Sequence, residues 1–446
     1  MKKTLLSFLI CTAATLPACT QHLPARLDSL MDAYVKVLGF NGTVFAATKG
    51  AVIFEKGYGY KNKSTNARND TNTIFQIGSI TKQFTSAIIL QLLEQNKLSL
   101  QDSLTKYIPD YPNGNKITIE HLLTHTAGVY NYTNDAVFMV NETTHPINRD
   151  SLINRFKYKP LDFQPGEKFS YSNSGYILLG YIIEKVTGQS YFQVVRQRIF
   201  QPLHMDHSGF DFTHLNSADK ATGYTTPEST TPANIVDSSV SFAAGAIYTT
   251  VGDLYKWDCA LRAGQIISSA SQEKAYTPHL AQYGYGWFIH TAGDGKKIVE
   301  HGGGITGFVS DIMRIPEDET CIVVLDNQPN GANPSNIASD ILATLDGKNV
   351  KFPETKVAIA VDTTILHQYV GTYQVSPTFS IAVTLDGGRL YGQATGQGKF
   401  ELFAEKKDVF FLKVVQAVVE FVRGADNKVE KLILHQNGQD IPGKRL

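Results

Sequence analysis

The sequence has little cysteine and no excess of charge of either sign. Lys plus Arg and Asp plus Glu each number 41 in 446 residues, so the net charge gives no indication of a nucleic-acid-binding surface. Of the four cysteines, Cys11 and Cys19 lie in the N-terminal segment, which leaves Cys259 and Cys321 and excludes a framework of disulfides. Both remaining cysteines have apolar neighbours in the sequence, so we expect them to be buried rather than reactive.

Two short motifs of common enzyme classes are also missing. No Gly-x-Ser-x-Gly sequence occurs, which argues against an α/β-hydrolase even though His301–Gly304 is similar to the oxyanion motif of lipases. No His-x-His sequence occurs either. His121 and His125 have a spacing that can bind zinc, but no acidic residue lies between them. We therefore interpret this pair as structural and expect no metal and no cofactor.

The first residues have the layout of an export signal. Lys2 and Lys3 precede the apolar run Leu5–Leu16, which is shorter than the roughly 20 residues of a membrane-spanning helix. We therefore expect residues 1–18 to be a signal peptide and the mature protein to be periplasmic or in the cell envelope. The four residues that end at Cys19 resemble a bacterial lipobox, which predicts membrane attachment through a lipid on Cys19. Ordinary cleavage nearby, giving a free soluble protein, is the alternative.

A helix predicted from Ser79 to Asn96 carries the first candidate catalytic pair. Apolar residues recur along it at intervals of four, which commits one face to the core. Ser79 and Lys82 lie one turn apart on another face, where a hydroxyl and an amine can act as nucleophile and base. In the alternative, Ser79 only caps the helix and Lys82 is solvated. The spacing alone does not decide this, since it recurs at Ser103/Lys106, Ser217/Lys220 and Ser271/Lys274.

Two later motifs supply further polar groups. Tyr171 and Asn173 lie at the entry to an apolar helix predicted over Gly175–Val186, where polar side chains can face a cleft. The sequence His301–Gly304 follows a predicted strand, and its glycines let the backbone approach a substrate closely. Residues 129–160 are polar and irregular in pattern, so we expect them to form a loop over a site.

The order of the predicted elements indicates an α+β fold. Strands near both ends of the domain with helices between them favour one antiparallel sheet closed by the first and last segments. The expected flanking strands and helices are Leu27–Leu38, Gly42–Ala47, Ala51–Tyr60, Phe308–Ile315, Thr320–Asp326 and Ser335–Leu345. This domain is expected at 25–346, followed by a linker at 347–364. Residues 365–446 alternate short strands with turns, which predicts a small all-β, barrel-like domain.

Taken in order, the motifs Ser79-x-x-Lys82, Tyr171-x-Asn173 and His301-Gly302-Gly303 resemble those of the serine β-lactamase and penicillin-binding-protein family. The similarity is to its class C and DD-peptidase-like branch, and it covers about residues 30–345. The stretches that support it are Phe75–Lys82, Ile117–Gly128, Pro165–Glu167, Tyr171–Asn173 and Ala244–Thr250. The C-terminal domain is similar to β-rich appendages of some family members.

The resemblance implies a serine hydrolase that acts through an acyl-enzyme. Ser79 would attack a carbonyl, and Lys82 or Tyr171 would serve as the base. Either base needs a pKa about three units below its usual value to act near neutral pH. Asn173 would orient Lys82 and the substrate amide, and the backbone N–H groups of Ser79 and Gly304 would bind the oxyanion. Which of the two bases carries the proton at each step stays open.

The resemblance also implies a substrate-binding role for His301, Gly302 and Gly303. Many β-lactamases of this branch have lysine where His301 stands, whereas histidine is common in related DD-peptidases, esterases and D-amino-acid amidases. Histidine is only partly charged near neutral pH, so efficient β-lactam hydrolysis does not follow from the resemblance. The expected partner is a small-molecule or peptide substrate. The alternative is a non-catalytic lipoprotein that binds penicillin or peptidoglycan fragments, but the full set of motifs argues against a mere binder.

Overall fold

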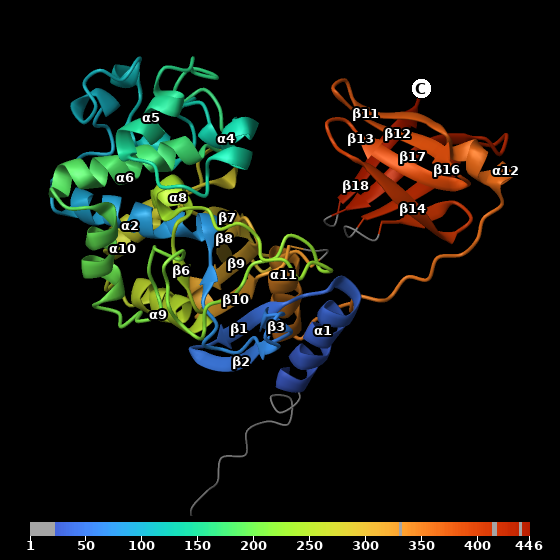
Figure 1. Cartoon of the computed structure of the whole chain (residues 1–446), viewed down its shortest axis with the longest axis horizontal. Coiled ribbons are helices and arrows are strands. Elements are labelled where there is room, and N and C mark those ends of the chain that lie inside the picture. The colour runs from blue at the N-terminus through green and yellow to red at the C-terminus, as the bar shows by residue number, and fades with distance from the viewer. Residues whose placement is uncertain (1–22, 330–331, 413–416, 437–438) are drawn as a thin grey trace, which may run out of the picture.

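The structure is a computed structural model that describes residues 23–329, 332–412, 417–436 and 439–446 (Figure 1). The predicted signal peptide at 1–18 and the lipidation candidate Cys19 lie outside these residues. Within the described ranges, none of the helices combines the length and apolar character that a bilayer-spanning helix needs.

A central antiparallel sheet has the strand order β2-β1-β10-β9-β8-β7. Its strands are β1 (Gly42–Thr48), β2 (Ala51–Gly57), β7 (Phe288–Thr291), β8 (Lys297–Ile305), β9 (Phe308–Ile315) and β10 (Thr320–Asp326). As predicted, the first and last segments of the domain complete one sheet, because β1 from the start of the domain pairs with β10 from its end. The predicted bounds of β9 and β10 agree with the structure residue for residue.

Two terminal helices cover one face of the sheet. They are α1 (Leu23–Leu38) and α11 (Pro334–Leu345), which pack on each other and on the strands around a core that includes Leu30, Val324 and Ile337. Both helices have an apolar stripe facing that core and polar residues elsewhere, the pattern expected for a helix on a sheet. In Figure 1 they lie together beside β1 and β10.

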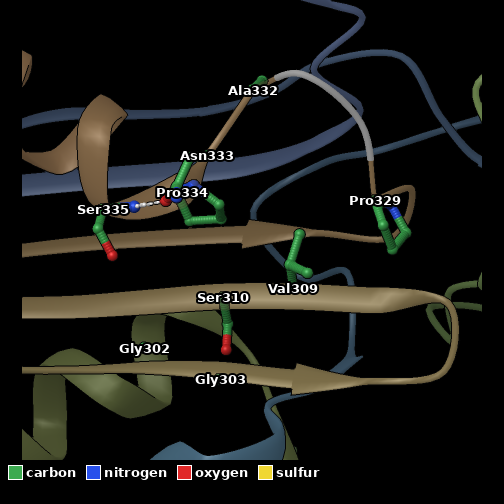
Figure 2. Close-up of a pocket in the computed structure, with 9 residues that line it drawn as sticks. All are labelled: Gly302, Gly303, Val309, Ser310, Pro329, Ala332, Asn333, Pro334 and Ser335. Carbon is green, nitrogen blue, oxygen red and sulfur yellow. Dashed lines mark hydrogen bonds between the residues drawn. The ribbon is translucent and has the colours of Figure 1, made fainter. Parts of the chain in front are cut away.

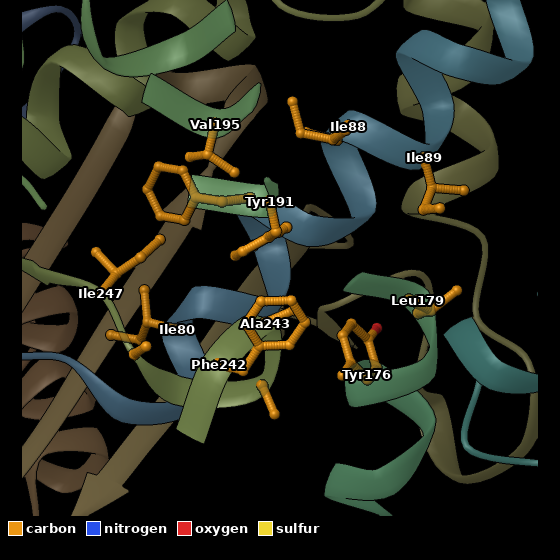
Figure 3. Close-up of a cluster of buried hydrophobic side chains, with 14 of the residues drawn as sticks. Ile80, Ile88, Ile89, Tyr176, Leu179, Tyr191, Val195, Phe242, Ala243 and Ile247 are labelled. Carbon is orange, nitrogen blue, oxygen red and sulfur yellow. The ribbon is translucent and has the colours of Figure 1, made fainter. Parts of the chain in front are cut away.

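The other face of the sheet carries a larger helical layer. Its elements are α2 (Thr81–Glu94), α3 (Ile119–Leu123), α4 (Ala136–Asn141), α5 (Arg149–Lys157), α6 (Asn173–Thr187), α7 (Tyr191–Val195), α8 (Ser238–Gly245), α9 (Val251–Arg262) and α10 (Ser269–Ala275). Figure 3 shows how Ile88, Leu179 and Phe242 from three of these helices join one buried apolar cluster. The helix α2 runs through the middle of this layer, and every residue from Thr81 to Leu90 is buried.

Shorter elements connect these layers. Two small sheets are formed by β3 (Tyr60–Asn62) with β4 (Ala67–Arg68) and by β5 (Phe75–Gln76) with β6 (Tyr248–Thr249). Single-turn helices occur at η1 (Gly78–Ile80), η2 (Leu104–Lys106), η3 (Gly114–Lys116), η4 (Tyr132–Asn134), η5 (Arg196–Phe200), η6 (Leu280–Gln282), η7 (Pro316–Asp318) and η8 (His367–Tyr369). The pairing of β5 with β6 brings the chain just before Ser79 against the segment that follows α8.

The prediction that 129–160 is an irregular loop was wrong, since this segment contains α4 and α5. The side chain of Asn148 accepts a hydrogen bond from the backbone N–H of Ser151 and so caps the start of α5. Its buried residues Leu152, Ile153 and Phe156 lie on one face, but the surrounding charges hide this short apolar pattern in the sequence. Cys259 also differs from its prediction, because it is partly exposed whereas Cys321 is buried.

The C-terminal strands form a closed antiparallel barrel in the order β11 to β18. Their bounds are β11 (Gly371–Ser376), β12 (Phe379–Asp386), β13 (Arg389–Ala394), β14 (Lys399–Lys406), β15 (Val409–Phe411), β16 (Ala417–Arg423), β17 (Val429–Gln436) and β18 (Gln439–Arg445). A short helix, α12 (Thr363–Leu366), precedes the barrel. The barrel has its own core around Tyr369, Tyr373 and Phe421. The predicted α+β fold with a β-barrel appendage is therefore confirmed.

Candidate active site

Ser79 lies in the single turn η1 that leads directly into α2. It caps neither helix, because Ile77 and Ile80 hold the cap positions and make no side-chain cap bond. The capping alternative therefore does not describe Ser79. Gly78, immediately before it, has φ +50, a left-handed conformation that favours glycine.

Strand β8 lies in direct backbone contact with this turn. A Cβ added to Gly303 would lie 2.0 Å from the carbonyl oxygen of Ile77, and a Cβ added to Gly78 would lie 2.8 Å from the backbone nitrogen of Gly304. No side chain fits at either position without moving the backbone. The two glycines thus let the turn that holds Ser79 and the glycine segment of β8 lie side by side.

Lys82 is fully buried, and its Nζ has three polar neighbours. Its Nζ lies 2.9 Å from Ser79 Oγ, 2.9 Å from Asn173 Oδ1 and 2.8 Å from the carbonyl oxygen of Ala244 in α8. Burial lowers the pKa of Lys82 well below 10.5. A neutral amine has two N–H groups and one lone pair. In that form the two carbonyl oxygens accept the N–H groups, which leaves the lone pair for the Ser79 hydroxyl.

Tyr171 lies in the loop before α6, with its ring next to Lys82 and its hydroxyl hydrogen-bonded to Ser79. The Nζ of Lys82 is 4.9 Å from the centre of the ring. Burial raises the pKa of the Tyr171 phenol, and this outweighs the lowering effect of the Ser79 hydroxyl. The two candidate bases therefore differ: burial favours the uncharged amine of Lys82, whereas it favours the protonated phenol of Tyr171.

Asn173 is the first residue of α6 and is held from three sides. Its backbone N–H donates to the Oδ1 of Asn131 at 3.1 Å, and its Nδ2 donates to the Oγ1 of Thr133 at 3.2 Å. Its remaining amide oxygen therefore faces Lys82. Asn131, Thr133 and Ala244 are not among the site residues predicted from the sequence. The first two follow closely on the stretch that ends at Gly128, which was the available signal.

His301 is buried, and protein groups occupy both of its ring nitrogens. Its Nδ1 lies 2.6 Å from the carbonyl oxygen of Gly302, which can only accept, so Nδ1 carries the proton. The hydroxyl of Tyr283 lies 3.0 Å from Nε2 and donates to it. Burial, reinforced by Lys82, lowers the pKa of His301 to about 3. The imidazole is thus neutral at physiological pH, rather than partly charged as its type alone suggests.

The glycine segment of β8 has one open edge. In the described part of the chain, β7 pairs with residues 297–300 of β8, and no strand covers the same edge at residues 302–305. Along an antiparallel strand the N–H groups alternate between the two edges, so every second residue presents its N–H to the open side. The glycine segment that bears this edge lies against the turn that holds Ser79.

A small cavity of about 280 Å³ lies beside the same glycine segment of β8. Figure 2 shows Gly302 and Gly303 on β8, Ser310 on β9 and Ser335 at the start of α11 around it. Ser79, Lys82 and Tyr171 do not line it. Beside it, the buried carboxyl of Asp311 accepts a hydrogen bond from the Ser335 hydroxyl at 2.7 Å.

The other residue pairs from the sequence take no part in this arrangement. Lys106 forms an ion pair with Asp102 at 2.8 Å, and Lys220 donates to the carbonyl oxygen of Thr213. His121 belongs to a capping box with Thr118 at the start of α3. Among the residues that the structure describes, no group of three or more His, Cys, Asp or Glu side chains could hold a metal ion.

Comparison with known proteins gives matches to both parts of the chain. The sequence model described as Beta-lactamase matches residues 27–345, and one described as a domain of unknown function (DUF3471) matches residues 355–445. A penicillin-binding protein of Bacillus subtilis (strain 168) is 29% identical over 450 residues, covering 94% of this chain and 98% of that protein.

Solved structures agree with these sequence matches. The octameric penicillin-binding protein homologue from Pyrococcus abyssi superposes with a TM-score of 0.67 at 29% identity, covering 94% of this chain and 99% of that one. A D-stereospecific amidohydrolase from Streptomyces superposes with a TM-score of 0.64 at 24% identity, covering 73% of this chain and 99% of that one. At this lower identity the second similarity establishes the fold.

Proposed function

The chain belongs to the β-lactamase family and is a homologue of penicillin-binding proteins, and on this premise we propose that it is a serine hydrolase. It cleaves an ester or amide through an acyl-enzyme on Ser79. The observation that carries the proposal is the buried contact between Lys82 Nζ and Ser79 Oγ at 2.9 Å, with the other two neighbours of the amine both acceptors. A serine whose hydroxyl faces the lone pair of an uncharged amine has a general base in place.

In the proposed acylation step, Lys82 takes the proton of Ser79 as the serine oxygen bonds to the substrate carbonyl carbon. Negative charge then develops on the carbonyl oxygen. The N–H of Ser79, at the start of the helical segment, and the N–H of Gly304 on β8 would bind that oxyanion. Their closeness is supported by the contact of Gly78 with the backbone of Gly304. Because both donors belong to the backbone, they need no reorganisation during the reaction.

Tyr171 has the complementary role in this proposal. It keeps its proton at neutral pH and shares a hydrogen bond with Ser79, so it can donate a proton to the leaving group as the tetrahedral intermediate collapses. The proton that Lys82 has accepted then replaces the one that Tyr171 has given. Water hydrolyses the acyl-enzyme by the same exchange in reverse.

The open edge of β8 supports an extended acyl group as the substrate. A peptide or amide can pair with this edge through its backbone, as an added strand does. His301 gives no permanent charge to a substrate carboxylate, because it is buried and neutral and its ring nitrogens are occupied. We therefore expect neutral esters, peptides and D-amino-acid amides to be turned over better than β-lactams, whose carboxylate gains no ion pair from His301.

A substrate panel tests this proposal. Purified protein is assayed side by side on a p-nitrophenyl ester, a D-amino-acid amide, a D-Ala-D-Ala peptide and nitrocefin, with Ser79→Ala as the control. Turnover of at least one ester or amide that is lost in Ser79→Ala supports the hydrolase. Stable penicillin binding without turnover of any substrate would favour the non-catalytic binder instead.

Export and lipid attachment at Cys19 are part of the same proposal and rest on the sequence alone. Mass spectrometry of the mature protein from cells tests them. A lipidated cysteine at the new N-terminus supports the anchor, whereas an unmodified residue beyond Cys19 would leave only secretion.

A further inference from the structure

His125 contacts the loop that holds Tyr171 more closely than its place in the sequence suggests. It is almost fully buried, with 2% of its surface exposed, and its backbone has φ +58. This left-handed conformation is uncommon for a residue with a side chain. Its ring packs on Tyr171, with the ring centres 4.2 Å apart, and on Tyr283 at 4.7 Å. Strained buried residues of this kind are held in place by their surroundings and often serve a site.

Two hydrogen bonds tie His125 to the backbone on either side of Tyr171. The N–H of Ser170 donates to the carbonyl oxygen of His125 at 2.9 Å, and the N–H of Ser172 donates to its Nδ1 at 3.2 Å. Both flanking residues of Tyr171 are therefore held by the same histidine. The left-handed backbone of His125 directs its carbonyl oxygen toward the N–H of Ser170. The bond from Ser172 to Nδ1 fixes the orientation of its ring.

The same bonds define the state of the imidazole. A peptide N–H can only donate, so Nδ1 is unprotonated and the proton of the neutral ring lies on Nε2. The Nε2 atom is buried and has no hydrogen-bond partner. Burial and the neighbouring Lys82 and His301 lower the pKa of His125 well below 6.5. A ring that stays neutral keeps the acceptor for Ser172 available at every pH at which the enzyme would work.

From these contacts we propose that His125 is the positioning residue for Tyr171, through the acceptor that its Nδ1 gives to the backbone of Ser172. This rests on the proposed function, in which Tyr171 transfers a proton. In this proposal His125 does not contact the substrate. A tyrosine that is misplaced by about 1 Å loses much of its catalytic effect, so a residue that acts only through it can change turnover strongly.

Three variants test the proposal, with turnover of the best ester from the substrate panel as the readout. His125→Phe keeps a ring but removes the acceptor, and we expect kcat to fall at least 10-fold with KM within 3-fold. His125→Asn keeps an acceptor and tolerates left-handed backbone, so it retains a higher kcat than His125→Phe. His121→Phe is the matched control, since His121 Nδ1 also accepts a backbone N–H, that of Thr118, but in a helix cap. It keeps kcat within 3-fold.

A double-mutant cycle with Tyr171→Phe separates positioning from general damage. If His125 acts through Tyr171, His125→Phe causes less than a 3-fold further loss of kcat in the Tyr171→Phe background. A full 10-fold loss there would overturn the proposal, as would a kcat of His125→Asn no higher than that of His125→Phe. If His125→Phe does not fold, as judged by thermal unfolding, His125→Asn replaces it in the cycle, with the same criterion of non-additive losses.

These outcomes are distinct from failure of the proposed function. A wild-type protein whose Ser79 forms no covalent adduct with a fluorophosphonate probe, or a Tyr171→Phe variant with unchanged turnover, would refute the proposed mechanism whatever the His125 variants do. A labelled Ser79 and an impaired Tyr171→Phe, combined with additive losses at His125, would refute the positioning role alone.

Discussion

The Nζ of Lys82 lies 2.9 Å from the Oγ of Ser79, and both of its other polar neighbours are carbonyl oxygens. This contact bears on which of two groups with a usual pKa near 10, the amine of Lys82 or the phenol of Tyr171, accepts the serine proton. Burial drives the pKa values of Lys82 and Tyr171 in opposite directions, because it disfavours the charged form of each: the ammonium of one and the phenolate of the other. Pairs of groups separated in this way divide acid and base roles between them.

Lys82 is expected to give kcat/KM a rising limb with pH. The amine must be unprotonated to act, and burial holds its pKa well below 10.5. Activity on a neutral ester is therefore lost as the pH falls through that lowered pKa and is present above it. Lys82→Ala lowers turnover at least 100-fold. Lys106→Ala, at the equivalent position of an unrelated Ser-x-x-Lys pair, serves as control and keeps full activity. A limb centred near 10.5 would contradict the role of Lys82.

Tyr171→Phe is expected to lower ester turnover at least 100-fold while leaving the fold intact. The substitution removes the hydroxyl that bonds to Ser79 but keeps the ring that packs on His125. The loss should be larger on an amide than on a matched p-nitrophenyl ester, since an amine leaving group must receive a proton and p-nitrophenolate need not. Paired steady-state assays measure this ratio, and equal losses on both substrates would remove Tyr171 from leaving-group protonation.

Gly303→Ala is expected to abolish most acylation of Ser79. The new methyl group would lie 2.0 Å from the carbonyl oxygen of Ile77, so β8 and the nucleophile turn would have to separate. We expect the rate of fluorophosphonate labelling to fall at least 100-fold, because the two oxyanion donors come from these two segments. Gly252→Ala in α9, where the nearest atom is 3.9 Å from the added methyl, is the matched control. Unchanged labelling in Gly303→Ala would show that the contact is dispensable.

The carboxyl of Asp311 is expected to make stability depend on pH. Burial, with a contribution from Glu300, raises its pKa from 3.8 to about 7. The folded state thus favours the protonated acid. The contribution of this carboxyl to the free energy of unfolding is therefore fully present below pH 3.8. It is lost as the pH rises from there to about 7, and the free energy of unfolding falls by at most about 1.4 kcal/mol per pH unit. Asp311→Asn removes this titration.

Chemical unfolding of wild type and Asp311→Asn between pH 4 and 8 measures that loss. The variant gains stability over the wild type as the pH rises, while Asp162→Asn, at an exposed carboxyl, shows no such gain. A constant difference between wild type and Asp311→Asn across this range would contradict the assigned pKa.

Strong local patterns allowed much of the fold to be predicted from the sequence. Strand β10 contains the apolar run Cys321–Leu325 and is buried throughout. The turn at Pro316–Asp318 separates it from β9, so both sets of bounds were correct. Helix α5 was missed because its charged surface outweighs a few buried residues, and α4 because it has only six residues, of which Phe138 is buried. Leu152 and Phe156 become informative only once the layer beneath them is known.

Site residues that lie close together in the sequence could be predicted from it. Contacts between residues far apart in the sequence could not. The Ser79 and Lys82 pair lies on one helical turn, so its spacing is visible in the sequence. The carbonyl oxygen of Ala244, which helps to leave the lysine lone pair free, comes from a segment more than 150 residues away, with a sequence separation of 162. The neutral state of His301 likewise depends on burial and on Lys82, and the contact of its Nε2 with Tyr283 also follows from tertiary packing alone.

Labelling of the intact protein by a fluorophosphonate tests the central claim most directly. The protein is treated with the probe, digested and analysed by mass spectrometry, with Ser79→Ala treated in parallel. We predict one covalent adduct on the peptide that contains Ser79, absent from Ser79→Ala and strongly slowed in Lys82→Ala. A protein that forms no adduct on Ser79, or an adduct that persists in Ser79→Ala, would contradict the acyl-enzyme mechanism.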